Sequence, residues 1–248
     1  MNNTLVKGLQ LLEVLARSEK PLGVSELAVL LGLGKSNVHR LLQALVELRY
    51  AVKQEQTSGY SASLKVWELG TALSGRMSIR NAAISEMDKL LASTRETVHL
   101  SVLDGDEVVY VHKLDSPEPV RSYSEVGGRA PAHCVATGKA IFAWQPEQRI
   151  AAISTRLVAH TPRTIVEPAA FAREMQKVRT QGYAVNKGEW RESVWGIAAP
   201  IRDSAGNVIA AIGISGPAAR MKPAQLKNMA ASVVGAAQAV TTTLNSGQ

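Results

Sequence analysis

The chain has 248 residues, of which 46% are hydrophobic and 20% charged, and its formal net charge is +7. This length allows one large domain or two modest ones. No run approaches the roughly 20 apolar residues that span a bilayer, the first residues carry no secretory signal, and the single cysteine, Cys134, cannot form an internal disulfide. We expect a cytoplasmic protein without a membrane partner, and the positive charge weakly favours an anionic one.

Two short helices are predicted at the beginning of the chain. Residues 4–17 show the 3.6-residue spacing of an amphipathic helix, which the stretch KPLG should end. A second helix, VSELAVLL, follows with Ser25 as its expected N-cap and Gly32 as its stop. The residues of the first helix that we expect to face the core are Leu5, Leu9, Leu12 and Ala16.

A third helix is predicted from about Lys35, after a tight turn. Its apolar residues form one stripe that packs inward, so its polar residues must point outward. Two short helices joined by a tight turn, the second with an exposed polar face, form the pattern of a DNA-binding helix-turn-helix. In this interpretation Arg40 bonds guanine, Asn37 reaches adenine, and Lys35 and Ser36 hold phosphate. The apolar stripe comprises Val38, Leu41, Leu42, Leu45 and Val46.

The next stretch, YAVKQEQTSGYSAS, predicts two short strands around a polar turn at residues 57–59. A hairpin directly after a helix-turn-helix is typical of a wing. Any surface helix has a polar face, so the order of three helices, turn and wing carries the argument for double-stranded DNA as the partner. The predicted DNA contacts are Lys35, Ser36, Asn37, His39, Arg40, Gln43, Lys53 and Gln54.

Residues 64–78 predict a connecting helix with exposed apolar side chains, and a longer helix should follow from Arg80 to about Arg95. Two alternating strands around Asp104-Gly105 then indicate a hairpin. The stretch PVRSYSE reads as a further strand, TGKAIFAW and EPAAFAREMQKVRTQG as helices, and YAVN as a strand. A second hairpin around residues 204–207 and a final helix complete a mixed α+β domain over residues 79–248. The longer helix should turn Ile84, Met87, Leu90 and Leu91 inward.

Three long blocks in this order resemble the IclR family of bacterial transcription regulators. They are PLGVSELAVLLGLGKSNVHRLLQAL, ETVHLSVLDGDEVVYVHKLDSPEPVRSYSEVGGRAPAHCVATGKAIFA and GYAVNKGEWRESVWGIAAPIRDSAGNVIAAIGISGP. The resemblance covers nearly the whole chain. It implies a winged helix-turn-helix domain (residues 1–63), a linker helix (64–78) and a GAF-like effector-binding domain with an antiparallel sheet (79–248). It also implies a homodimer paired through the DNA-binding domains, often assembled into a tetramer, that binds palindromic operators.

The resemblance further implies a pocket for a small effector, frequently a carboxylic acid from a catabolic pathway. The pocket would be lined by the loop before ATGKA, by the strand after GYA and by the last hairpin. The free amides at the beginning of a helix can hold a carboxylate, which supports Ala136, Thr137 and Gly138 as contacts. The effector contacts predicted in this way are Val126, Gly128, Ala132, Ala136, Thr137, Gly138, Ile141, Asn186, Trp190, Gly196, Gly213 and Ser215.

Four of these positions depart from the family pattern. Asn186, Gly196, Gly213 and Ser215 stand where well-studied members carry Asp, Cys and two Ser. Our hypothesis is that the two glycines leave free volume, which would make the pocket wider, less polar and suited to an aromatic or longer acid. The alternative is that Trp195 or a neighbour refills the space.

Some residues suggest other chemistry. His133 and Cys134 are adjacent, and neighbours in sequence rarely converge on one metal, so we expect neither a metal site nor a cofactor. Cys134 has no base in view that would make it a nucleophile. The competing function is an enzyme that acts on a small organic acid, with the first domain serving dimerisation, but no carboxylate pair or triad supports it. A regulator without any ligand is a third possibility.

Overall fold

The computed structural model describes residues 3–75 and 78–246 and divides the chain into two compact units, Met1–Arg76 and Met77–Gln248. The division lies inside the segment 64–78 that the sequence predicts as a linker. Among the described residues, no helix is both long and apolar enough to cross a membrane.

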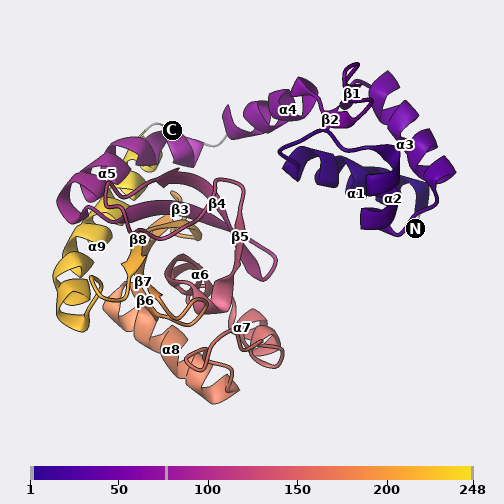
Figure 1. Cartoon of the computed structure of the whole chain (residues 1–248). Helices are drawn as coiled ribbons and strands as arrows, with labels where there is room; N and C mark the ends of the chain where they lie inside the picture. The colour runs from indigo at the N-terminus through magenta and orange to yellow at the C-terminus, as the bar shows by residue number, and fades with distance from the viewer. Residues whose placement is uncertain (1–2, 76–77, 247–248) are drawn as a thin grey trace. The chain divides into compact units, whose positions relative to one another are not determined.

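The first unit consists of three helices, a two-stranded antiparallel hairpin and a fourth helix (Figure 1). A backbone bridge between Leu22 and Tyr60 ties the hairpin to the connection between the first two helices. The core is small, and leucines of the three helices make up half of its buried residues. The elements are α1 (Asn3–Arg17), α2 (Val24–Leu31), α3 (Lys35–Glu47), β1 (Ala51–Lys53), β2 (Tyr60–Ala62) and α4 (Leu64–Gly75).

The inward face of α1 differs from the predicted one. Leu11 and Leu15 are buried, whereas Leu5 and Leu9 are 61% and 52% exposed. The helix carries leucines on two faces, so helical spacing could not decide which of them packs against α3. The prediction of the inward residues of α1 was therefore wrong.

The start of α2 also differs, although its end does not. The helix begins one residue before Ser25, and its N-cap is Gly23, whose backbone N–H donates to the Glu26 carboxylate at 2.8 Å. Ser25 therefore lies inside the first turn of the helix and is not its N-cap. Gly32 ends the helix in the left-handed conformation at φ 62°, as predicted.

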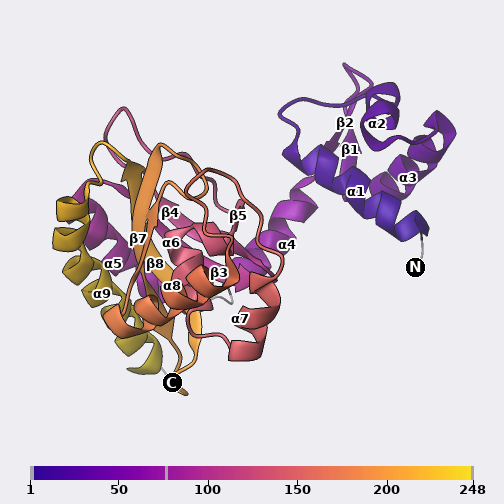
Figure 2. The same ribbon diagram turned by 90° about the horizontal axis from the view of Figure 1, so that it is seen from below.

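The second unit is built on a six-stranded antiparallel sheet with strand order β5-β4-β3-β8-β7-β6. Figure 2 shows α5 and α9 covering one face and α6 and α8 the other. The elements are α5 (Ser78–Thr94), β3 (Thr97–Asp104), β4 (Glu107–Leu114), β5 (Arg129–Pro131), the 3-10 turn η1 (Ala132–Cys134), α6 (Ala136–Phe142), α7 (Glu147–Ser154), α8 (Pro168–Gln181), β6 (Ala184–Lys187), β7 (Val194–Arg202), β8 (Val208–Pro217) and α9 (Pro223–Ser246).

The sheet separates two apolar clusters. One lies between the sheet and α5 and α9, and the other between the sheet and α6, α7 and α8. Because side chains alternate between the faces of a strand, each central strand contributes to both clusters. On β8, Ile212 and Ile214 pack toward α9, while Ala211 belongs to the cluster around α6.

Three predictions for this unit need correction. The stretch PVRSYSE is not a strand, because β5 takes the edge beside β4 and residues 119–125 form a loop. Ile84 is 39% exposed, since α5 turns Ile79 and Ala83 inward together with the predicted Met87 and Leu90. The helix α7 was not predicted.

Candidate functional site

The first candidate site is the polar face of α3. Val38 and Leu42 are fully buried on the opposite side of this helix. Val46, predicted as part of the buried stripe, is 36% exposed because it lies in the last turn, at the edge of the small core. Of the predicted DNA contacts on the helix, Asn37 is half-buried, and the exposed ones are Lys35, Ser36, His39, Arg40 and Gln43.

The wing adds a second polar surface to this unit. Lys53 and Gln54 are exposed, and the backbone N–H of Gln54 donates to the carbonyl of Gly59 at 2.8 Å, which closes the loop of the hairpin. Within residues 3–75 and 78–246, no ion pair involves Lys35, Arg40 or Lys53. These cations can therefore meet phosphate without first breaking a salt bridge.

The second candidate site is a pocket on the α6 face of the sheet. It holds about 500 Å³ of empty space, counted with the part that is open to solvent. Segments far apart in the sequence line it, from β3, the loop of residues 122–124, the beginning of α6, and β6 to β8. Seven of the predicted effector contacts lie there: Ala136, Thr137, Asn186, Trp190, Gly196, Gly213 and Ser215.

The other five predicted effector contacts lie outside the pocket. A side-chain carbon at Gly138 would lie 2.2 Å from the carbonyl oxygen of Ala132, so the lack of a side chain lets α6 pack closely on η1. Ala132 and Ile141 are themselves buried in the cluster around α6. Val126 is 59% exposed, and the carbonyl of Gly128 is bonded to the backbone of β4.

Neighbouring residues, and not free volume, lie where side chains at the two sheet glycines would be. A side-chain carbon at Gly213 would lie 2.5 Å from both the carbonyl oxygen of Ile197 and Cβ of Ala198, and one at Gly196 would lie 2.8 Å from the Ile214 carbonyl oxygen. The adjacent strands thus occupy the space where side chains would be, and the glycines do not widen the pocket. Trp195 does not refill it either, because it packs with the cluster on the opposite face.

Three polar side chains, those of Ser215, His99 and Ser124, form a row in the pocket. Nε2 of His99 lies 2.6 Å from the hydroxyl of Ser215, and its Nδ1 lies 3.4 Å from the hydroxyl of Ser124. The ring also contacts Tyr110 at 5.0 Å between centroids. Burial and, to a smaller extent, the Lys113 ammonium together lower the pKa of His99 to about 4. At neutral pH the imidazole is therefore neutral and can donate one hydrogen bond and accept another.

The rim of the pocket is aromatic and carries one cation. Rings of Tyr110, Tyr123 and Trp190 line the pocket, and Arg191 is the one charged side chain among its described lining residues. The Arg191 guanidinium lies 4.5 Å from the centre of the Trp190 ring, and it donates to the Tyr123 carbonyl at 3.4 Å. Arg191 is exposed, so it can reach a ligand at the mouth of the pocket.

A buried ion pair supports the segment that carries Trp190 and Arg191. The ammonium of Lys139, on α6, is fully buried and donates to Glu189 at 2.7 Å and to Glu174 at 3.0 Å. Burial raises the pKa of Glu189, and the Lys139 ammonium opposes that effect. The Glu189 backbone N–H donates to the Asn186 side chain at 2.8 Å. These bonds fix the segment relative to α6.

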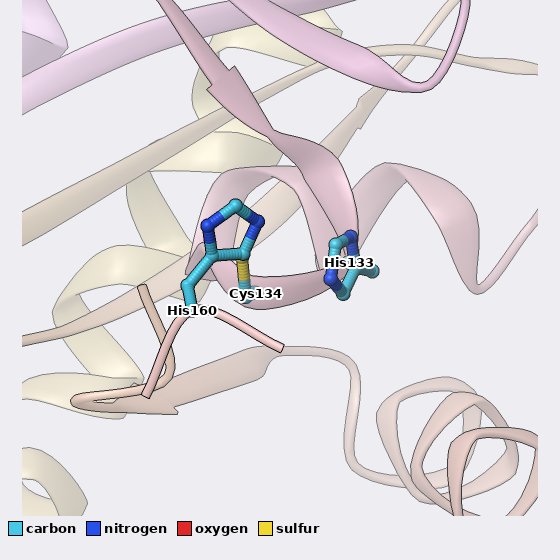
Figure 3. Close-up of side chains that lie close together, drawn as sticks. All are labelled: His133, Cys134 and His160. Atoms are coloured by element: carbon cyan, nitrogen blue, oxygen red, sulfur yellow. The ribbon is translucent and has the colours of Figure 1, made fainter. Parts of the chain in front are cut away.

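A third group of polar side chains lies apart from the pocket. Figure 3 shows His133, Cys134 and His160 close together, two from η1 and one from the loop between α7 and α8. One ligand atom from each lies within 4.8 Å of the others. Burial raises the pKa of the Cys134 thiol to about 12 and lowers the pKa of His133, so at neutral pH both are uncharged.

Comparison with known families assigns both units. A model of the C-terminal domain of the bacterial transcriptional regulator IclR matches residues 71–242, and a model of the IclR helix-turn-helix domain matches residues 4–55. The chain belongs to the IclR family of bacterial transcriptional regulators. Its DNA-binding and effector-domain folds are thus those expected from the sequence.

IclR-family relatives align over almost the full length of this chain. The transcriptional regulator KdgR of Escherichia coli K12 is 34% identical, over 90% of this chain and 85% of its own length. The glycerol operon regulatory protein of Streptomyces coelicolor is 32% identical, over 99% and 97%. An IclR homologue from Microbacterium hydrocarbonoxydans, solved in complex with 4-hydroxybenzoate, superposes with a TM-score of 0.85 at 25% identity, over 98% of this chain and 99% of its own.

Some pocket residues of this IclR-family chain were missed by the sequence analysis. His99 was not among the predicted contacts, although alternation along β3 and its pairing with Gly213 place it on the pocket face. Tyr123 and Ser124 lie in the segment that was misread as a strand. Arg191 follows Trp190 directly, but nothing in the sequence pattern showed that both meet the pocket.

Proposed function

We propose that this regulator binds a palindromic operator of a catabolic operon through α3 and the wing, and that a small carboxylic acid in the pocket of the second unit controls that binding. Aromatic acids are the first effector class to examine. The observation that carries the proposal is that one chain holds an exposed helix-turn-helix face, whose Lys35 and Arg40 form no ion pair with the described residues, and a pocket whose described lining carries one cation, Arg191.

The DNA part rests on α3. Ser36, His39, Arg40 and Gln43 recur at positions i, i+3, i+4 and i+7, so they share the face opposite the buried Val38. An exposed face of this kind fits the major groove, where arginine reads guanine and amides read adenine. Lys53 and Gln54 of the wing would lie against the adjacent backbone or minor groove.

The effector part rests on the chemistry of the pocket. Arg191 supplies positive charge for a carboxylate, while Tyr110 and Trp190 offer flat apolar surface and the His99–Ser215 pair offers hydrogen bonds inside. The complex of the Microbacterium homologue with 4-hydroxybenzoate supports an aromatic acid as one candidate.

The assembly part rests on exposed apolar residues. Leu5 and Leu9 on α1 and Leu64, Trp67 and Leu73 on α4 are each more than half exposed. Apolar surface of this kind favours association, and two copies would present two α3 helices to a palindrome. We propose a homodimer, and sedimentation of the full chain distinguishes it from a tetramer or a monomer.

Binding to DNA tests the proposal. The full chain is incubated with a labelled fragment from upstream of its own gene at two salt concentrations, with excess unrelated DNA and a panel of small carboxylates. Competitor-resistant binding that one acid shifts supports the proposal. The control Lys177→Ala removes an exposed cation from α8, so it lowers the net charge without touching α3.

The competing reading as an enzyme gives a different result. In that case an acid of the panel would be chemically altered after incubation with the protein, and the DNA fragment would be bound no better than the competitor. An acid recovered unchanged from a complex that it shifts supports regulation.

A further inference from the structure

We propose that His133, Cys134 and His160 form a binding site for one divalent transition-metal ion, with zinc as the best match to this ligand set. The site is separate from the effector pocket, because none of the three residues lines that pocket. Two histidine nitrogens and one thiolate suit zinc, and a water would complete a tetrahedral shell.

The distances are near those of a bound site. In a tetrahedral zinc site, with Zn–N bonds near 2.0–2.1 Å and Zn–S bonds near 2.3 Å, neighbouring ligand atoms lie about 3.3–3.6 Å apart. Here the three ligand atoms lie within 4.8 Å of one another. The remaining difference is about 1 Å, and the exposed His160 side chain on its loop can move by that amount.

His133 already has the hydrogen bond that a histidine ligand needs. Its Nε2 lies 3.0 Å from the carbonyl oxygen of Val158, which can only accept, so Nε2 carries the proton. The other ring nitrogen, Nδ1, then keeps a free lone pair. Metal-binding histidines usually donate their second nitrogen to a carbonyl or carboxylate in this way. Val158 and His160 belong to the same loop.

Cys134 has no strong competing partner. Its Sγ is fully buried and makes a weak contact with the Pro131 carbonyl at 3.5 Å. Metal binding would replace the S–H proton by an S–metal bond and release that proton to solvent. The adjacent group of Lys139, Glu174 and Glu189 holds one positive and two negative side chains, so it does not oppose a cation.

The sequence alone argues against this site because it shows only an adjacent His-Cys pair. Neighbouring side chains of a 3-10 turn point about 120° apart. His133 and Cys134 can therefore bind the same ion only if it lies beside the turn, between the two side chains. The fold supplies the third ligand there by bringing His160 from the loop between α7 and α8 (Figure 3).

Cobalt titration of the chelator-treated full chain tests the proposal, because a thiolate ligand gives a charge-transfer band in the near ultraviolet. We expect one equivalent per chain, displacement by one equivalent of zinc, and loss of the band in Cys134→Ser. Removing the exposed ligand in His160→Ala should weaken binding at least 10-fold without disturbing the core. His112→Ala, on β4 and outside the cluster, is the matched control and should bind like wild type.

Three results would overturn the proposal. The first is wild-type protein that shows no thiolate band with cobalt at stoichiometric concentration. The second is a band that persists in His160→Ala with unchanged affinity. The third is equal loss of affinity in His112→Ala, which would indicate scattered histidine binding.

Discussion

The two units present their candidate sites in different ways. The polar strip of α3 lies on the outside of a small leucine core, and one helix supplies most of it. The pocket lies inside the second unit, where separate strands, a loop and the beginning of α6 meet. A surface site is thus encoded locally, whereas an enclosed site depends on the packing of many segments.

This comparison predicts that substitutions inside the second unit lower the free energy of unfolding more than substitutions on its surface do. Lys139→Ala leaves the buried carboxylate of Glu189 without its cation, and breaking a buried pair costs about 3–5 kcal/mol. We expect the free energy of unfolding of the second unit, measured with denaturant, to fall by that amount. Lys177→Ala, which removes an exposed lysine of the same unit, should leave it within about 0.5 kcal/mol. Equal effects of the two variants would contradict the role of the buried network.

The second effect concerns pH. His99 has a pKa near 6.5 when unfolded and about 4 when folded, so the unfolded chain binds the proton first. The stability that depends on neutral His99 is present above pH 6.5 and is lost as the pH falls toward 4, at about 1.4 kcal/mol per pKa unit. Thermal melts of wild type and His99→Gln across this range check it. The same acid slope in both would show that another group is responsible.

The third effect concerns the surface site. Arg40→Ala should weaken operator binding by about 1–3 kcal/mol and relax sequence preference if Arg40 reads a base. Because Arg40 is exposed, the stability of the unit should not change. Competition binding against substituted operators measures both. A uniform loss on all DNA with a smaller salt dependence would instead make Arg40 a phosphate contact.

The smallest effect concerns the rim of the pocket. Arg191 is exposed, so its ion pair with a carboxylate is worth up to about 1 kcal/mol, or roughly a 5-fold loss of affinity in Arg191→Ala. Calorimetric titration with the acid and with its methyl ester isolates the contribution of the ligand's negative charge. The uncharged ester should bind wild type and Arg191→Ala with the same affinity. An unchanged affinity for the acid would remove Arg191 from the effector site.

The same difference explains what the sequence could and could not predict. Helical spacing placed α3, and alternation placed the three hairpins, because those signals are local. Spacing failed for α1, where two faces carry leucines, and for Ile84, where the partner helix decides which side is buried.

The pocket shows the same limit. Gly213 and Ser215 could be placed there, but the role of Gly213 depends on how closely β7 approaches. The contact of Lys139 with Glu189 and the approach of His160 to Cys134 each join segments that are distant in sequence. No pattern in a single sequence reports such contacts.

The central claim is that the pocket and the α3 face are energetically coupled. The most direct measurement is the affinity of the full chain for its operator with and without the bound acid, together with its affinity for the acid with and without operator. Linkage requires both ratios to be the same factor, typically 5- to 150-fold. We predict one shared factor in that range. The account would be contradicted if the chain binds both the acid and the operator but neither ligand changes the affinity for the other.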